Sequence, residues 1–357
     1  MVDLPDRLSR AIDVLVQRAA PMDLPKVVAG LSARYRSGKA GGAVADAKDV
    51  AAYVSARMPA TFAAVAAALD AVAVARPGFM PASHLDAGSG PGTAMWAAAH
   101  IWPEAPAWQV PGHILLLDDS AVFQESGRFL AGHAASPGLR EATWRRADLS
   151  LPLSDLGSHE LVTAAYLLGE LTGPAQIELL AQLWAACSGM LVLVEPGTPQ
   201  GFARILAARS RLIGLGGHVI APCPHDRDCP LEAPDWCHFA TRVQRTQLHR
   251  RAKSAVLGYE DEKYAYVALV RPRPLQAARS PAEAVPAGVA VGRVLRSPRL
   301  ASGHVELSLC TDETASRHIV SRRAGAGYRL ARKARWGDWV DMTNAETPVS
   351  RPGAGER

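Results

Sequence analysis

Apolar residues recur at helical spacing in the first part of the chain. The earliest run consists of Leu4, Leu8, Ile12, Leu15 and Val16. An alanine-rich run over residues 50–75 also has apolar residues on one face, and the glycine-containing stretch 37–42 separates the two runs. These patterns predict a helical N-terminal region over residues 1–80.

From residue 83 onward, short apolar strands alternate with helical segments. The expected strands are 84–86, 114–117, 161–165, 191–194 and 264–270. The expected helices are 93–100, 121–133, 174–187 and 201–212. Strands separated by helices pair in parallel, so the pattern predicts an α/β domain with a doubly wound, Rossmann-like sheet over residues 81–272.

The composition changes after this domain. Proline and alanine dominate residues 273–290, which we expect to be a linker. Short alternating segments then predict a small β-rich appendage over residues 291–342, with strands at 292–300, 304–310 and 317–322. The polar stretch 343–357 is expected to be a disordered tail.

Positive charge is concentrated late in the chain. The net charge is +5, but ten Arg or Lys and three Asp or Glu lie between Val291 and Trp336. This distribution fits a polyanionic partner, and the alternative is a solvated face. The candidate phosphate contacts are Arg242, Arg245, Arg293, Arg296, Lys333 and Arg335.

The N-terminus predicts a location. The first seven residues include Asp3 and Asp6 and have no apolar core after a basic start, which is unlike a secretory signal or a transit peptide. The most apolar stretch, Phe62–Leu69, is far too short to span a bilayer. We therefore expect a cytoplasmic protein with no membrane partner.

A glycine-rich loop opens the first expected helix of the α/β domain. Gly88, Gly90 and Gly92 follow a strand, where glycine lets the backbone approach a nucleotide closely. The spacing differs from that of dinucleotide binders and of P-loops, and Asp86 precedes the glycines. The pattern favours an S-adenosylmethionine site over the alternative, a tight turn without a ligand.

Two further carboxylates extend this hypothesis. Asp118 ends the second strand and is a candidate acceptor for both ribose hydroxyls, with Asp119 as a substitute. Asp148 is placed to accept from an adenine amino group. The alternative for both is an exposed loop carboxylate.

The residues that would contact the substrate are less clearly indicated by the sequence. Tyr166 and Glu170 are candidate substrate-side residues, with packing at a helix start as an equal alternative. Cys187 lies before an apolar strand, so we expect a core thiol there rather than a nucleophile. The sequence identifies no catalytic base, and methyl transfer requires alignment more than acid–base help.

Three of the five cysteines lie in the polar, proline-rich loop 221–239. Cys223, Cys229 and Cys237 have the spacing C-x5-C-x7-C, which predicts metal ligation more than disulfides. A closed site needs a fourth ligand, for which the candidates are His225, His238 and Cys310. Four thiolates suit an iron–sulfur cluster or zinc, one histidine favours zinc, and the alternative is a loop without metal.

Several segments together resemble the methyltransferase-like small-ribosomal-subunit assembly factors of mitochondria and bacteria. They are residues 85–93, 161–171, 193–202, 221–239 and 331–338. The resemblance extends from about Ala33 onward, and its specific parts are the cysteine run and the ending Trp336-Gly337-Asp338. Glu160 departs from the family, whose members commonly have Asp there.

This resemblance implies an S-adenosylmethionine-type fold, association with small-subunit rRNA during ribosome assembly, and a four-iron cluster. Its four ligands would be Cys223, Cys229, Cys237 and Cys310, so that the site joins the appendage to the α/β domain. The leading hypothesis is an rRNA-directed, S-adenosylmethionine-dependent methyltransferase or methyltransferase-like factor. The alternatives are a non-catalytic rRNA-binding chaperone with an iron–sulfur cluster and a small-molecule methyltransferase with a zinc-stapled lid.

Overall fold

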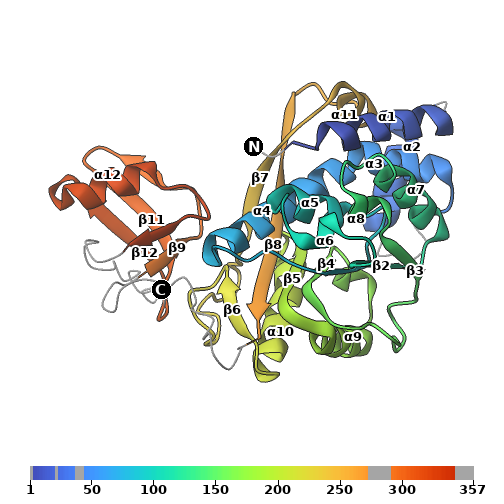
Figure 1. Cartoon of the computed structure of the whole chain (residues 1–357). Coiled ribbons are helices and arrows are strands. Elements are labelled where there is room, and N and C mark those ends of the chain that lie inside the picture. The colour runs from blue at the N-terminus through green and yellow to red at the C-terminus, as the bar shows by residue number, and fades with distance from the viewer. Residues whose placement is uncertain (1–2, 21–22, 37–43, 272–290, 342–357) are drawn as a thin grey trace.

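An eight-stranded sheet organises residues 44–271 (Figure 1). The computed structural model describes residues 3–20, 23–36, 44–271 and 291–341. The strand order is β3-β2-β1-β4-β5-β8-β6, and β7 pairs with the first half of β8. The strands are β1 (His84–Ala87), β2 (Ile114–Asp118), β3 (Thr143–Arg146), β4 (His159–Ala165), β5 (Cys187–Pro196), β6 (His218–Ala221), β7 (Phe239–Gln244) and β8 (Tyr259–Val270).

The sheet confirms the predicted doubly wound, Rossmann-like fold. Strands β1 to β5 pair in parallel, whereas β8 is antiparallel to both β5 and β6. The strand order reverses between β1 and β4, and ligands of such sheets bind at the carboxyl ends of the strands beside that reversal. The topology therefore locates the candidate site before any side chain is considered.

Helices cover both faces of the sheet, and successive side chains of β8 alternate between the two cores. Tyr264, Tyr266 and Ala268 belong to the core on one face, and Ala265 and Val267 belong to the core on the other. Helices α4, α5 and α7 contribute to the first core, and α9 and α10 to the second. A strand buried on both faces appears in the sequence as a continuous apolar run rather than an alternating one, as this strand does.

Four helices, over residues 93–101, 121–131, 173–186 and 199–214, match expected segments closely, whereas the short ones over 106–109, 137–140, 168–170 and 247–252 were not expected. The helices in the described part of this domain are, in chain order, α1 (Asp6–Ala19), α2 (Leu24–Arg36), α3 (Ala47–Ala56), α4 (Met58–Ala75), α5 (Thr93–Ile101), α6 (Pro106–Gln109), α7 (Ala121–Ala131), α8 (Pro137–Arg140), η1 (Leu168–Glu170), α9 (Gly173–Ala186), α10 (Pro199–Gly214) and α11 (Gln247–Ala252). Helices α1 to α4 share one hydrophobic core with the strands, so the N-terminal helices are part of the larger body.

The expected helical run 50–75 is broken into α3 and α4 at Arg57. Pro59 lies in the first turn of α4, and a proline ring there would clash with the carbonyl of Ser55 if one helix continued. By length and composition α4 could cross a membrane, yet 72% of it is buried within the protein, as in a core helix. The break orients the end of α3 toward the carboxyl edge of the sheet.

Residues 291–341 form a second, five-stranded antiparallel sheet beside the larger body (Figure 1). Its elements are β9 (Val291–Val294), β10 (Arg299–Ala301), β11 (His304–Cys310), β12 (Ala315–Ser321), η2 (Arg322–Ala324), α12 (Ala326–Lys333) and β13 (Trp339–Asp341). The segment expected as one strand over 292–300 is two strands, and helix α12 was not expected. Glycines at 325 and 327 argue against a helix locally, whereas packing of Tyr328 and Ala331 on the sheet stabilises one. The predicted linker 273–290 and tail 343–357 lie outside the described residues.

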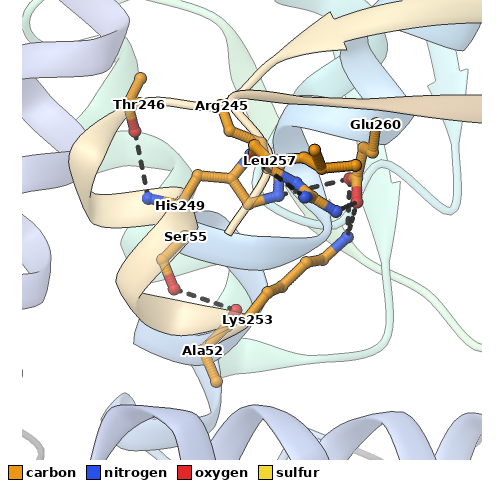
Figure 2. Close-up of polar contacts among 8 residues, drawn as sticks. All are labelled: Ala52, Ser55, Arg245, Thr246, His249, Lys253, Leu257 and Glu260. Carbon is orange, nitrogen blue, oxygen red and sulfur yellow. Dashed lines mark hydrogen bonds and ion pairs between the residues drawn. The ribbon is translucent and has the colours of Figure 1, made fainter. Parts of the chain in front are cut away.

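A half-buried carboxylate, Glu260, joins the long β7–β8 hairpin to α11. Figure 2 shows Arg245, His249 and Lys253 around Glu260. Lys253 Nζ donates to Oε1 and Oε2 of Glu260 at 2.6 and 2.7 Å, and Arg245 Nη2 donates to Oε2 at 2.7 Å. The His249 ring lies 3.3 Å from Oε1, and Thr246 caps α11 by accepting from the His249 amide. The carboxylate therefore holds two elements at once.

Glu260→Gln is expected to lower the free energy of unfolding by about 2 kcal/mol, because it leaves the half-buried cations of Arg245 and Lys253 without a counter-charge. Burial alone would raise the pKa of Glu260, but hydrogen bonds from His249, Lys253 and Arg245 hold it well below its ordinary range. A lowered pKa means that this stabilisation is present above about pH 4.3, the value for an unfolded glutamate, and declines as the pH falls below it. Urea unfolding of both proteins at several pH values measures the effect.

Asp261→Asn provides the matched control. Asp261 is the neighbouring residue on β8 and pairs with Arg242 at an exposed position. Solvent screens such a pair, so its loss should leave the urea midpoint almost unchanged. Equal midpoints for Glu260→Gln and Asp261→Asn would contradict the role assigned to Glu260.

Candidate functional site

A pocket of about 740 Å³ opens at the carboxyl edge of the sheet, where β1, β2, β4 and β5 end. Gly88, Gly90, Asp118 and Asp148 line it, as predicted from the sequence. Asp86 and Gly92 do not. The pocket lies where the strand order reverses, which is the ligand position of this class of sheet.

The glycine loop brings bare backbone to the pocket wall. Gly88 and Gly90 have φ values of +68° and +51°, which favour glycine. A Cβ on Gly88 would lie 2.9 Å from Cδ1 of Leu167, so close packing requires glycine there. A Cβ on Gly90 would lie 3.9 Å from the Tyr53 hydroxyl, an ordinary van der Waals distance, so the positive φ rather than crowding favours glycine there.

Asp86 corrects one expectation, because it lies beneath the loop rather than on the pocket wall. Its side chain is 1% exposed, and Oδ1 accepts from the Thr163 hydroxyl on β4 at 2.7 Å. Burial raises the pKa of Asp86 to about 7, although that hydrogen bond opposes the shift. Thr163 gives its only proton to Asp86, so Nε2 of His84, 2.8 Å from the same hydroxyl, must be the donor. His84, Thr163 and Asp86 therefore form a buried chain of hydrogen bonds.

Asp118 shapes the glycine loop and also faces the pocket. Its Oδ2 accepts from the Gly90 amide at 2.7 Å and its Oδ1 from the Ser120 amide at 2.9 Å. Burial raises the pKa of Asp118 to about 6, against these two hydrogen bonds. Asp119 is exposed and lines the same pocket. Both carboxylates are therefore within the pocket region, and Asp118 also orders the loop.

Asp148 lies at the open side of the pocket. It is exposed, and the Ser150 amide and hydroxyl donate to its Oδ1 at 2.9 and 2.6 Å. These hydrogen bonds lower the pKa of Asp148, so it is an ionised acceptor at neutral pH. Asp148, the residue expected to accept from an adenine amino group, lines the same pocket as Gly88, Gly90 and Asp118.

Tyr166 and Glu170, the candidate substrate-side residues, also line this pocket. Tyr166 follows β4 with φ +59°, and its hydroxyl donates to Glu262 at 3.0 Å. A non-glycine residue in this region is strained, which is more common at functional sites. Burial raises the pKa of Glu170 to about 7, with neighbouring carboxylates adding to the shift. Glu170 therefore exchanges a proton near neutral pH.

Sequence reasoning missed several residues of this pocket, among them Tyr53, Arg57, Glu195 and Arg204. Glu195 ends β5, where it accepts from Arg204 Nε at 2.7 Å and from the Leu168 amide at 2.9 Å. A polar residue at the carboxyl end of an apolar strand was a usable signal for Glu195. No local signal marks Tyr53 and Arg57, because the N-terminal helices bring them to the pocket.

A second, smaller cavity of about 30 Å³ is lined by Cys223, Cys229, Cys237 and Cys310 together. The first three lie in the loop between β6 and β7, and Cys310 ends β11 of the appendage. Neither His225 nor His238 lines this cavity. In the described residues, no three or more His, Cys, Asp or Glu side chains are close enough to hold a single metal ion.

The position of Cys310 at the end of β11 does not by itself explain why its side chain is buried. Along β11, Val305, Leu307 and Leu309 face the core of the appendage, and the alternate residues Glu306 and Ser308 are only partly buried. Cys310 lies on this second face but is 7% exposed, because it lines the cysteine cavity. Tertiary contact therefore buries a position that the appendage alone would leave more accessible.

Burial is also the main influence on the pKa of the Cys223, Cys237 and Cys310 thiols. It raises the pKa of Cys223, while the positive charges of Arg209 and Arg293 oppose it. Cys187 lies elsewhere, at the start of β5, where burial raises its pKa to about 12. Such a thiol is inert as a nucleophile, in agreement with the core role expected for Cys187.

The residues predicted to contact phosphate differ in exposure and in ion pairing. Arg293 corrects the expectation, because it is 5% exposed and so is not accessible to a phosphate. Three others form ion pairs: Arg242 with Asp261, Arg245 with Glu260, and Arg296 with Asp235. Lys333 and Arg335 are exposed. Exposed arginines that the sequence reasoning did not select lie beside them, at positions 322, 323, 329 and 332.

Residues 47–341 match the family described as mitochondrial small ribosomal subunit Rsm22. The chain belongs to the Rsm22 family. The match extends over the glycine loop, the cysteine loop and the appendage, so all three are parts of one family architecture. The resemblance found in the sequence is thereby confirmed.

Two curated relatives of this Rsm22-family chain also match it over most of its length. The human ribosome assembly protein METTL17, mitochondrial, is 31% identical over 315 residues, which cover 84% of this chain and 63% of that protein. The Rsm22-cox11 tandem protein 2, mitochondrial, of Schizosaccharomyces pombe is 27% identical over 333 residues, covering 81% and 42%. The chain thus spans less than two thirds of the length of these relatives.

The predicted cytoplasmic location is wrong in the light of these findings. The Rsm22 family and the relatives above are all described as mitochondrial. The prediction depended on the absence of a targeting pattern near the N-terminus, and such an absence does not establish a location.

Solved structures of methyltransferases also align with part of this Rsm22-family chain. The plantazolicin methyltransferase BpumL covers 70% of this chain and 99% of its own, with a TM-score of 0.39 and 13% identity. The magnesium protoporphyrin IX methyltransferase of Synechocystis, with bound SAM, covers 58% and 77%, with a TM-score of 0.35 and 16% identity.

Proposed function

We propose that this chain is a methyltransferase-like assembly factor that binds S-adenosylmethionine and the rRNA of the assembling small ribosomal subunit. The observation that carries the proposal is the match to the Rsm22 family, which includes the pocket, the cysteine loop and the basic appendage. The human relative is described as a ribosome assembly protein, which agrees with this role.

The residues that line the pocket fit S-adenosylmethionine. Gly90 has no side chain between its backbone and the pocket, and Asp118 or Asp119 would accept from the ribose hydroxyls of the ligand. Asp148 would accept from the adenine amino group, and Gly88 would contribute bare backbone. When bound, this cofactor supplies an electrophilic methyl group on a sulfonium centre. Carboxylates in the pocket suit its positive charge.

Binding of S-adenosylmethionine is expected to strengthen roughly tenfold between pH 6 and pH 8. The raised pKa values of Glu170, about 7, and Asp118, about 6, leave both carboxyls partly protonated at pH 6. A cationic ligand prefers the ionised forms, so its affinity rises as the carboxyls lose protons, despite Arg57 and Arg204 in the same pocket. Titration calorimetry at several pH values measures this.

Glu170→Gln is the control, and it should flatten the pH dependence. The α-amino group of the ligand titrates equally with both proteins, so any difference between them reports Glu170. No heat at roughly millimolar ligand would overturn the proposed cofactor. Binding with identical pH dependence in both proteins would overturn the part assigned to Glu170.

For the cysteine cavity, we propose a four-iron cluster on Cys223, Cys229, Cys237 and Cys310. All four thiols line one cavity, and no histidine does. A single zinc ion is less suitable, since Zn–S bonds of about 2.3 Å would draw the sulfur atoms closer together. When bound, the cluster supplies four covalent links that connect the larger body with the appendage.

Cys310→Ser is expected to remove most of the bound iron and sulfide from protein purified without oxygen. The change takes away the one ligand contributed by the appendage. Iron and sulfide analysis, together with the visible absorption of thiolate-bound iron, provides the measurement. Cys187→Ala is the matched control and should retain both. Full retention in Cys310→Ser would contradict its assignment as a ligand.

The appendage provides the surface that we propose for rRNA. Exposed cations gather at η2, along α12 and just after it. They are Arg322, Arg323, Arg329, Arg332, Lys333 and Arg335. Clustered cations on one small element are typical of phosphate contacts, which supply most of the affinity for nucleic acids.

The double change Arg329→Gln with Lys333→Gln is expected to weaken binding to a small-subunit rRNA fragment. Loss of two phosphate contacts should reduce the slope of log affinity against log salt by about 1.5. Fluorescence anisotropy over a salt series measures both quantities. The control, Arg7→Gln with Arg211→Gln, removes the same charge from exposed positions on α1 and α10. Equal losses in both double variants would show that binding depends only on net charge.

A further inference from the structure

The cysteine cavity contains two cations as well as four thiols. Arg209 on α10 and Arg293 on β9 both line it, and they are its charged lining residues. Their exposed fractions are 3% and 5%. Among the described residues, neither forms an ion pair with a carboxylate. Burying a guanidinium without a counter-charge is costly, so the structure implies a negative group beside them.

Arg209 approaches the cavity from the larger body. Its Nη2 donates to the carbonyls of His225 and Arg227, both at 2.7 Å. These carbonyls lie between Cys223 and Cys229, so Arg209 holds the loop that carries two of the thiols. The Nε–H of Arg209 is buried and has no acceptor within the described residues.

Arg293 approaches from the appendage. It is the direct cross-strand partner of Cys310 in the pairing of β9 with β11, which places both side chains on one face. Its Nη2 donates to the Tyr266 hydroxyl on β8 at 3.0 Å, and its guanidinium lies 4.8 Å from the Trp339 ring centroid. Its Nε–H is also buried without an acceptor in the described part of the chain.

The geometry points to Arg209 and Arg293 as the counter-cations of the thiolate centre: their unsatisfied Nε–H groups donate to its sulfur atoms and set its reduction potential. This inference rests on the proposed iron–sulfur cluster. Four thiolates around a doubly positive core carry two net negative charges, and two guanidinium groups neutralise them. Hydrogen bonds to sulfur and nearby charge are among the factors that determine cluster potentials. Both arginines are positioning residues that act on the centre.

The test is a potentiometric titration of the full-length protein with its cluster, followed by electron paramagnetic resonance. Arg209→Gln and Arg293→Gln should each shift the midpoint potential to a more negative value, because the reduced centre loses a stabilising positive charge. Arg209→Lys and Arg293→Lys keep the charge and should recover much of the shift. Arg211→Gln removes an exposed charge from the same helix as Arg209 and should leave the potential unchanged.

Each remaining outcome is also decisive. If the Gln variants lose the centre and the Lys variants keep it, the need for positive charge is confirmed. If folded Gln and Lys variants both lose it, the arginines have a purely structural role and the inference is overturned. An intact centre with wild-type potential in both Gln variants overturns the inference alone. Wild-type protein that contains no iron or sulfide overturns the proposed cluster itself, and this inference with it, before any variant is made.

Discussion

The insertion of β8 between β5 and β6 is the constraint on which the other features depend. Its second half is buried on both faces and completes the large sheet. Its first half extends to pair with β7, and Glu260 there holds α11 in place. Tyr266, in the second half, lines the cysteine cavity and accepts a hydrogen bond from Arg293 of the appendage. One strand therefore connects the core, the hairpin and the second body.

Helix α10 contributes lining residues to both candidate sites. Arg204 lines the pocket at the carboxyl edge of the sheet, and Arg209, five residues later, lines the cysteine cavity. A rise of about 1.5 Å per residue separates these positions by roughly 8 Å along the helix axis. The Cys223 and Cys229 loop is tied to the same helix through Arg209. The two sites thus share one rigid element although they use different strands.

Much of the fold was predictable because its signals are local. Apolar strands alternating with helices indicated the doubly wound sheet, and the glycine loop indicated the pocket. Gly88, Gly90, Asp118 and Asp148 do line that pocket. Asp86 was misplaced because sequence position gives the end of a strand but not the depth at which its side chain lies. Pairing with Thr163 on β4, far away in the chain, places Asp86 in the interior.

The sequence by itself determined the order of strands and helices, the glycine loop and the grouping of three cysteines, since each depends on neighbouring residues. Tertiary structure alone decided which distant side chains meet. It brought Tyr53 and Arg57 into the pocket, placed Cys310 with the other thiols, and buried Arg293 instead of exposing it. Such contacts depend on the packing of elements that are remote in sequence, and no local pattern of residues encodes that packing.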